Sequence, residues 1–193
     1  MFKRFLFAAA GILMLTALCG AQQVSKRRLD AIWESVDARV STQIDTWYDD
    51  GDFPKSIRLL VFQADYAPND YDAVTNLAWM QENVQDWEGA LTTYKLYRVN
   101  NPKDPDRALS EANYYFRQKQ YDKVPPLLEP VMHERAHSNN FRILAHAYER
   151  LKRYSDAVRV WKLFLVREPN DEPAKLNLKR DLARANSSRS PKP

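Results

Sequence analysis

Two stretches of the sequence, 71–104 and 138–171, repeat one pattern over 34 residues. They share a small residue at the eighth position, an aromatic at the seventeenth, Ala at the twentieth and Pro at the thirty-second. These residues are Ala78, Trp87, Ala90 and Pro102 in the first stretch, and Ala145, Tyr154, Ala157 and Pro169 in the second. A period of this length with two helix-sized blocks predicts stacked helical hairpins rather than one closed globule.

Each shared position has a mechanical reason in such a hairpin. Small residues at positions eight and twenty let its two helices approach closely. The aromatic is expected to begin the second helix and to wedge between the pair. The Pro ends the second helix, because it has no N–H to donate and restricts the residue before it.

This pattern resembles the tetratricopeptide repeat family over most of the chain. The resemblance implies an all-α superhelix of about four hairpins, with repeats at 37–70, 71–104, 105–137 and 138–171. Repeat one matches in its second half, with Gly51-Asp52-Phe53 at the turn, but Ile44 stands where the family has a small residue.

Repeat three departs most from the pattern, because it is one residue short and lacks the final Pro. Pro125 and Pro126 fit the first turn of a helix, where Pro is tolerated, whereas Pro130 is expected to kink or end that helix. Repeat three also lies where an acidic half of the chain is followed by a basic half. Residues 22–106 carry 9 basic and 15 acidic side chains, and residues 107–193 carry 18 and 10.

Both ends of the array have a predicted structure. Apolar residues between Ser25 and Asp50 recur at three- and four-residue steps, which predicts one long helix or two joined ones, with residues 22–36 as a helical extension. Residues 172–185 are predicted to form a capping helix with Asp171 as its N-cap. The polar, basic residues 186–193 are predicted to be disordered.

The first 21 residues have the layout of a secretory signal peptide. Lys3 and Arg4 precede an apolar run at 6–18, and small residues follow, so cleavage after Ala21 is expected. This layout predicts export to a bacterial periplasm. The alternatives are a lipoprotein acylated at Cys19, which is the single cysteine of the chain, and an uncleaved membrane anchor.

The resemblance also implies which residues face the concave groove of the superhelix. Aromatic, amide and cationic side chains at these positions suit an extended peptide, because amides hold its backbone and arginines its carboxylates. The alternative for the two aromatic residues is that they pack into neighbouring helices. The predicted partner-binding residues are Trp79, Asn83, Asn113, Phe116, Arg117, Arg142 and His146.

One segment carries a different chemical signal. Residues 133–137 read His-Glu-Arg-Ala-His, which fits the H-E-x-x-H zinc motif of metalloproteases. The metzincin extension is missing, because Asn140 and Ile143 stand where it needs Gly and His. We therefore expect solvated polar groups near a helix end rather than a metal centre, and no cofactor.

The sequence as a whole predicts a non-enzymatic protein–protein interaction module, an adaptor or assembly scaffold of the bacterial envelope. Its expected partner is a protein or peptide, with no nucleic acid and with peripheral or lipid-anchored membrane association as a further expectation. The alternatives are a zinc-dependent hydrolase that uses residues 133–137 and a structural component that binds through its convex face.

Overall fold

The computed structural model describes the backbone of residues 2–132 and 136–189, and side chains from 25 to 132 and from 136 to 187. Every regular element among these residues is helical, as predicted. The chain divides into two compact units, residues 1–63 and 64–193.

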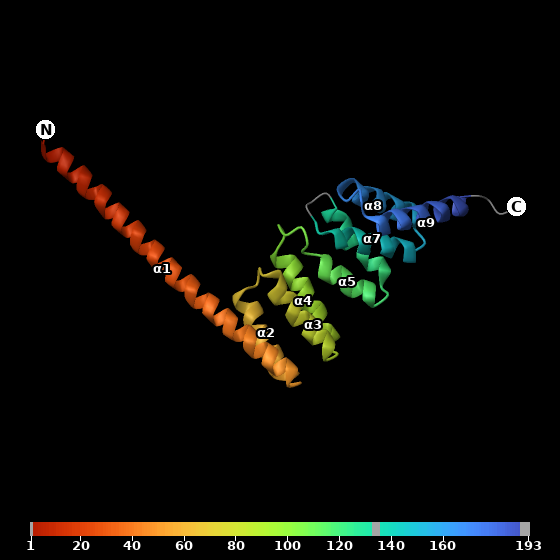
Figure 1. Ribbon diagram of the computed structural model, residues 1–193, viewed down its shortest axis with the longest axis horizontal. Helices are drawn as coiled ribbons and strands as arrows, with labels where there is room; N and C mark the ends of the chain where they lie inside the picture. The colour runs from red at the N-terminus through yellow and green to blue at the C-terminus, as the bar shows by residue number, and fades with distance from the viewer. Residues whose placement is uncertain (1, 133–135, 190–193) are drawn as a thin grey trace. The chain divides into compact units, whose positions relative to one another are not determined.

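The first unit contains α1 (Phe2–Asp49), one uninterrupted helix (Figure 1), and most of α2 (Phe53–Tyr66). A tight turn reverses the chain between them, and Ile44 of α1 is buried. The Ser56 hydroxyl of α2 donates to the Ile44 carbonyl at 3.4 Å, and the Gln63 amide donates to the Asp37 carboxylate at 2.8 Å. Because Ser56 has a short side chain, α2 approaches α1 closely even though Ile44 is large.

The second unit is a succession of helices that follow one another along the chain (Figure 1). Helices α3 and α4 form one hairpin, α7 and α8 form another, and α9 packs against α8. Between the two hairpins lie α5 and a broken second helix. The elements are α3 (Tyr71–Asn83), α4 (Trp87–Asn100), α5 (Leu109–Arg117), the 3₁₀ turn η1 (Tyr121–Lys123), α6 (Val124–Leu128), the 3₁₀ turn η2 (Glu129–Val131), α7 (Ser138–Arg150), α8 (Tyr154–Arg167) and α9 (Glu172–Arg189).

The four hairpin turns share one backbone geometry. In each, the fifteenth residue of the repeat has a positive φ, between 59° and 75°. The N–H of the next residue then bonds to the carbonyl five residues back, as in a Schellman cap. The residues with positive φ are Gly51, Gln85, Lys119 and Lys152. Repeat three therefore keeps a regular turn although both of its helices depart from the pattern.

Side chains cap the helices of these hairpins. Asp70 accepts a hydrogen bond from the Ala73 N–H and Asp86 from the Gly89 N–H, both at 3.0 Å. At α7 the N-cap is His137, whose Nδ1 accepts from the Asn139 N–H at 3.2 Å. Ser138 is therefore the first residue of the helix and not its cap.

The core of the second unit is built around small residues. Ala78, Ala90, Ala145 and Ala157 are all completely buried, which agrees with the role given to the eighth and twentieth positions. The expected aromatic wedge is wrong for Trp87, because this residue begins α4 but is 45% exposed. Larger core side chains lie within the helices instead, with Trp161 at 1% exposure.

Repeat three has the proline-broken second helix that the sequence predicted. Pro125 lies in the first turn of the five-residue α6, and Pro130 lies in the 3₁₀ turn that replaces its continuation. Its first helix is shorter than expected, because α5 begins only at Leu109. The residues before it form turns in which the Asp104 carboxylate accepts from the Asp106 N–H at 2.8 Å.

The last helix, α9, is capped by Asp171, whose carboxylate accepts from the Ala174 N–H at 2.8 Å, as predicted. It continues to Arg189, so residues 186–189 are helical and the prediction of disorder is wrong for them. Residues 190–193 lie outside the described part of the chain. No helix within the described residues is both long and apolar enough to span a bilayer.

Candidate partner-binding site

The first helices of successive hairpins are joined by polar contacts along the second unit. The Tyr71 hydroxyl of α3 lies 2.6 Å from the Ser110 hydroxyl of α5. The Asp106 carboxylate, just before α5, accepts from the Asn140 amide of α7 at 2.6 Å. Helices α3, α5 and α7 are therefore neighbours along the array. Their outward side chains form a surface that we call the first-helix face. It comprises Trp79, Asn83, Asn113, Arg117, Arg142 and His146.

Trp79 is the most prominent side chain of this face. It lies in the second half of α3 and is 48% exposed, which agrees with its expected accessibility. Asn83, at the end of the same helix, is also exposed. Asn113 lies on α5 and is half-buried. An exposed indole beside amides can pack on the side chains of a peptide while the amides bond to its backbone.

Arg117 is held by an ion pair rather than left free for a ligand. Its guanidinium donates to both Glu82 oxygens, at 2.5 and 2.6 Å. The Tyr94 hydroxyl of α4 donates to the same carboxylate at 2.8 Å. Burial raises the pKa of Tyr94, and its bond to Glu82 raises it further. Arg117 thus ties α5 to α3.

Phe116 does not belong to the exposed surface. It is half-buried against the core of the second unit, and its ring packs edge-on against Tyr121 at 5.2 Å. The alternative that this aromatic packs into neighbouring helices is therefore correct for Phe116. It is not correct for Trp79, whose indole keeps about half of its surface open.

The two expected residues of α7 also make contacts within the chain. Arg142 pairs with Asp171 at 2.5 Å and lies over the Phe164 ring at 5.1 Å. The bond from the Ala174 N–H and the charge of Arg142 lower the pKa of Asp171. The imidazole of His146 lies 3.1 Å from Glu149 and packs against Trp161. Both side chains remain partly accessible.

The structure describes the H-E-x-x-H segment only in part. His133, Glu134 and Arg135 lie outside the described residues, and His137 serves as the N-cap of α7. Elsewhere in the described chain, no group of three or more His, Cys, Asp or Glu side chains is placed to hold a metal ion.

The chain resembles known proteins at the level of the fold. A model of the family "Anaphase-promoting complex, cyclosome, subunit 3" matches residues 83–162, and no curated protein matches the sequence. The solved structure of MamA aligns with a TM-score of 0.59 at 13% identity, covering 74% of this chain and 79% of MamA. MamA of strain AMB-1 aligns with a TM-score of 0.56 at 19% identity, covering 78% and 84%.

A tetratricopeptide repeat protein from Parabacteroides merdae aligns with a TM-score of 0.55 at 11% identity, covering 76% of this chain and 58% of that protein. With the repeated Schellman turns and the buried small residues, these alignments decide the architecture. The chain has the tetratricopeptide-repeat fold.

Within the tetratricopeptide array, sequence reasoning missed two buried acids, Glu111 of α5 and Asp181 of α9. Asp181 of α9 is completely buried, and the Trp161 indole N–H donates to its Oδ2 at 3.1 Å. Leu176 and Leu182 of the predicted capping helix are 67% and 37% exposed. The inward stripe is Ala174, Leu178, Asp181 and Ala185, at steps of four, three and four residues, so a helical plot would have shown an acid within it.

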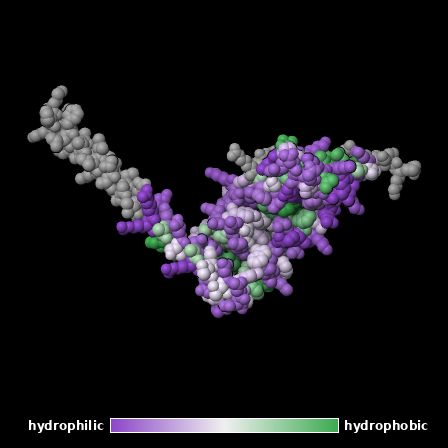
Figure 2. Space-filling view, viewed as in Figure 1, coloured by the Kyte–Doolittle hydropathy of each residue, from purple (hydrophilic) through white to green (hydrophobic). Residues whose placement is uncertain are grey.

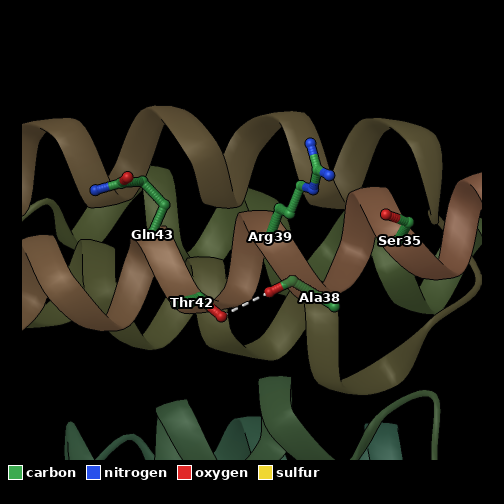
Figure 3. Close-up of a pocket in the computed structure, with 5 residues that line it drawn as sticks. All are labelled: Ser35, Ala38, Arg39, Thr42 and Gln43. Atoms are coloured by element: carbon green, nitrogen blue, oxygen red, sulfur yellow. Dashed lines mark hydrogen bonds between the residues drawn. The ribbon is translucent and has the colours of Figure 1, made fainter.

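The described surface has several depressions. Five residues of α1 line one of them, namely Ser35, Ala38, Arg39, Thr42 and Gln43 (Figure 3). The Thr42 hydroxyl there donates to the Ala38 carbonyl of its own helix at 2.8 Å. Because one helix supplies all five residues, the depression brings no distant groups together. The visible surface of the second unit is largely hydrophilic with small apolar patches (Figure 2).

Proposed function

We propose that this chain is a non-catalytic protein-interaction module that binds a peptide segment of another protein on the first-helix face. The exposed indole of Trp79 carries the proposal. Exposed tryptophans beside hydrogen-bonding groups are enriched at the centres of protein interfaces, where they contribute most of the binding energy.

Two ion pairs of the face support this proposal because they fix the helices that carry the indole and the amides. Arg117 is held by Glu82, and Arg142 is held by Asp171. Groups fixed before binding lose little conformational entropy when a partner docks, which favours affinity. The arginines act here mainly by positioning the helices, so amides and the indole are the proposed contacts.

The proposed location is the bacterial periplasm, with cleavage after Ala21. The support is the layout of residues 1–21, with a basic start, a short apolar run and small residues before the expected cleavage site. Mass spectrometry of the mature protein separates the possibilities. A mature terminus at Gln22 supports simple secretion, a diacylated Cys19 indicates a lipoprotein, and an intact Met1 contradicts both.

The binding proposal is tested by two matched tryptophan substitutions. Trp79→Ala removes the indole from the first-helix face, and Trp87→Ala removes one of similar exposure, 45%, from the start of α4. In pull-downs from the envelope of source cells, Trp79→Ala should lose a specific partner at least tenfold, whereas Trp87→Ala should retain it.

Both variants should keep the helical circular dichroism of the wild type, which shows that the array is folded. Equal recovery of the partner by wild type and Trp79→Ala would contradict binding through the first-helix face. Loss with Trp87→Ala alone would move the binding surface to the second helices.

A further inference from the structure

Two carboxyl groups, one completely buried and the other largely buried, lie where α9 attaches to the array. Asp181 of α9 is completely buried beneath α7 and α8, and its Oδ1 receives no hydrogen bond. The guanidinium of Arg180 bonds to the Glu149 carboxylate of α7 and lies 3.8 Å from Asp181 Oδ1, so the two carboxyl groups are neighbours around one cation. Two ionised carboxylates in that position would repel each other in a site with little water, so a proton shared between them resolves the contact.

Other groups around this pair determine which carboxyl keeps the proton. Glu149 receives a bond from the exposed guanidinium of Arg180 and lies 3.1 Å from His146 of α7. Asp181 receives the Trp161 indole N–H of α8 on its other oxygen. The guanidinium groups of Arg180 and Arg184 lie farther from Asp181, at 3.8 and 3.6 Å, and are partly exposed to solvent.

These contacts favour a charged Glu149 and a neutral Asp181. Burial opposes ionisation of Glu149, but bonds involving His146, Asp181 and Arg180 outweigh it and lower the pKa of Glu149 to about 2. Burial raises the pKa of Asp181 most, and the bond to Glu149 and its negative charge raise it further, to about 7, against the smaller opposing effects of Trp161 and Arg180.

We propose that Asp181 and Glu149 share one proton and that loss of this proton loosens α9 from α7 and α8. The array then has a pH-dependent terminal helix. Release of α9 would uncover Trp161, which is 1% exposed. It would also free Glu149 from Arg180 at the end of the first-helix face, so the last part of this face would change with pH.

The direction of the effect follows from proton binding. The docked state keeps a proton on Asp181 up to a pKa of about 7, whereas a released Asp181 loses it near its ordinary value of 3.8. The stabilisation is therefore fully present below about pH 4 and is lost as the pH rises to about 7. Over that range the equilibrium constant for release of α9 increases by up to tenfold per pH unit. The effect of Glu149 on the docking of α9 has the opposite sign. The stabilisation that depends on the charge of Glu149 is lost as the pH falls from 4.5 towards about 2.

Hydrogen–deuterium exchange of the full chain between pH 4.5 and 8 tests the proposal. Protection factors of α9, corrected for the intrinsic pH dependence of exchange, should fall at least tenfold in the wild type, while those of α3 and α4 should not follow. In Asp181→Asn the amide donates to Glu149 without titrating. Its α9 should keep constant protection and be better protected than the wild type at pH 8.

Two control variants test whether other groups cause the fall in protection of α9. Glu172→Gln removes an exposed carboxylate from the same helix and should behave as the wild type. His146→Gln should keep the fall in protection, because the His146 imidazole is not the proposed proton carrier. Constant protection in the wild type, or the same fall in Asp181→Asn, would overturn the proposal.

A second variant keeps the test decisive if Asp181→Asn does not fold. Glu149→Gln replaces the repelling carboxylate with an amide that donates to an ionised Asp181. The fall in protection should then move to lower pH and be absent above pH 6. An unchanged fall between pH 6 and 7 in this variant would also overturn the proposal.

Discussion

The residue with a positive φ in each hairpin turn gives the sharpest stability prediction. Gly51 occupies this position in the first turn, whereas Gln85, Lys119 and Lys152 occupy it in the others, with φ of 67°, 60° and 59°. A non-glycine residue pays about 1–2 kcal/mol in this conformation because its Cβ crowds the backbone. Lys152→Gly should therefore stabilise the protein.

The expected gain is smaller than the full backbone cost. Glycine also makes the unfolded chain more flexible, which subtracts about 0.5–1 kcal/mol. The exposed Lys152 side chain contributes little packing. The net increase in the free energy of unfolding should be about 0.5–1 kcal/mol, or a rise in melting temperature of about 1–4 °C for a chain of this size.

Urea unfolding followed by circular dichroism at 222 nm measures this difference. Lys162→Gly is the matched control, since Lys162 is exposed within the regular helix α8, where glycine costs about 1 kcal/mol. The two Lys→Gly substitutions should thus have opposite signs. A loss of stability in Lys152→Gly similar to that in Lys162→Gly would refute the explanation of the shared turn.

Three further substitutions test contacts between helices and the cap of one helix. Arg98→Met leaves the buried Glu111 without its 2.6 Å partner and should lower the free energy of unfolding in urea by about 3 kcal/mol. The double variant Arg98→Met/Glu111→Leu should restore most of this stability. Equal stability of Arg98→Met and the wild type would contradict this. Ala145→Leu should overpack the buried contact between α7 and α8 and cost about 1–3 kcal/mol in thermal unfolding, unlike Ala183→Leu on the exposed side of α9. Asp86→Ala removes the cap of α4 and should cost about 1 kcal/mol, measured as faster amide exchange at the start of that helix.

The fold could be predicted from sequence where spacing alone determines it. The period of 34 residues, the buried alanines at the eighth and twentieth positions and the proline stops are local patterns that repeat, so each occurrence supports the others. The prolines of repeat three also act locally, and α6 ends where they require. Trp87 shows the limit of this reasoning, because the register places it at a helix start without fixing how deeply its ring is buried.

The helices that carry the candidate residues could be predicted from the register, but the contacts of their side chains could not. Helical register identified Trp79 and Arg117, but it could not show that Arg117 is paired with Glu82, 35 residues away. Phe116 was assigned to the wrong environment, because its packing against Tyr121 depends on the irregular turn η1. Asp181 lies in the inward stripe of α9, but its bond to the Trp161 indole depends on packing between helices and could not be predicted from the sequence.

Site-specific photo-crosslinking tests the central claim, that partners bind on the first-helix face. A photoreactive phenylalanine derivative replaces Asn83, exposed at the end of α3, or Lys95, exposed on the second helix α4. In source cells the probe at position 83 should capture one discrete protein, and excess unlabelled wild-type chain should reduce the yield, whereas the probe at 95 should not capture it. Capture of the same protein from position 95 but not from position 83 would contradict the account.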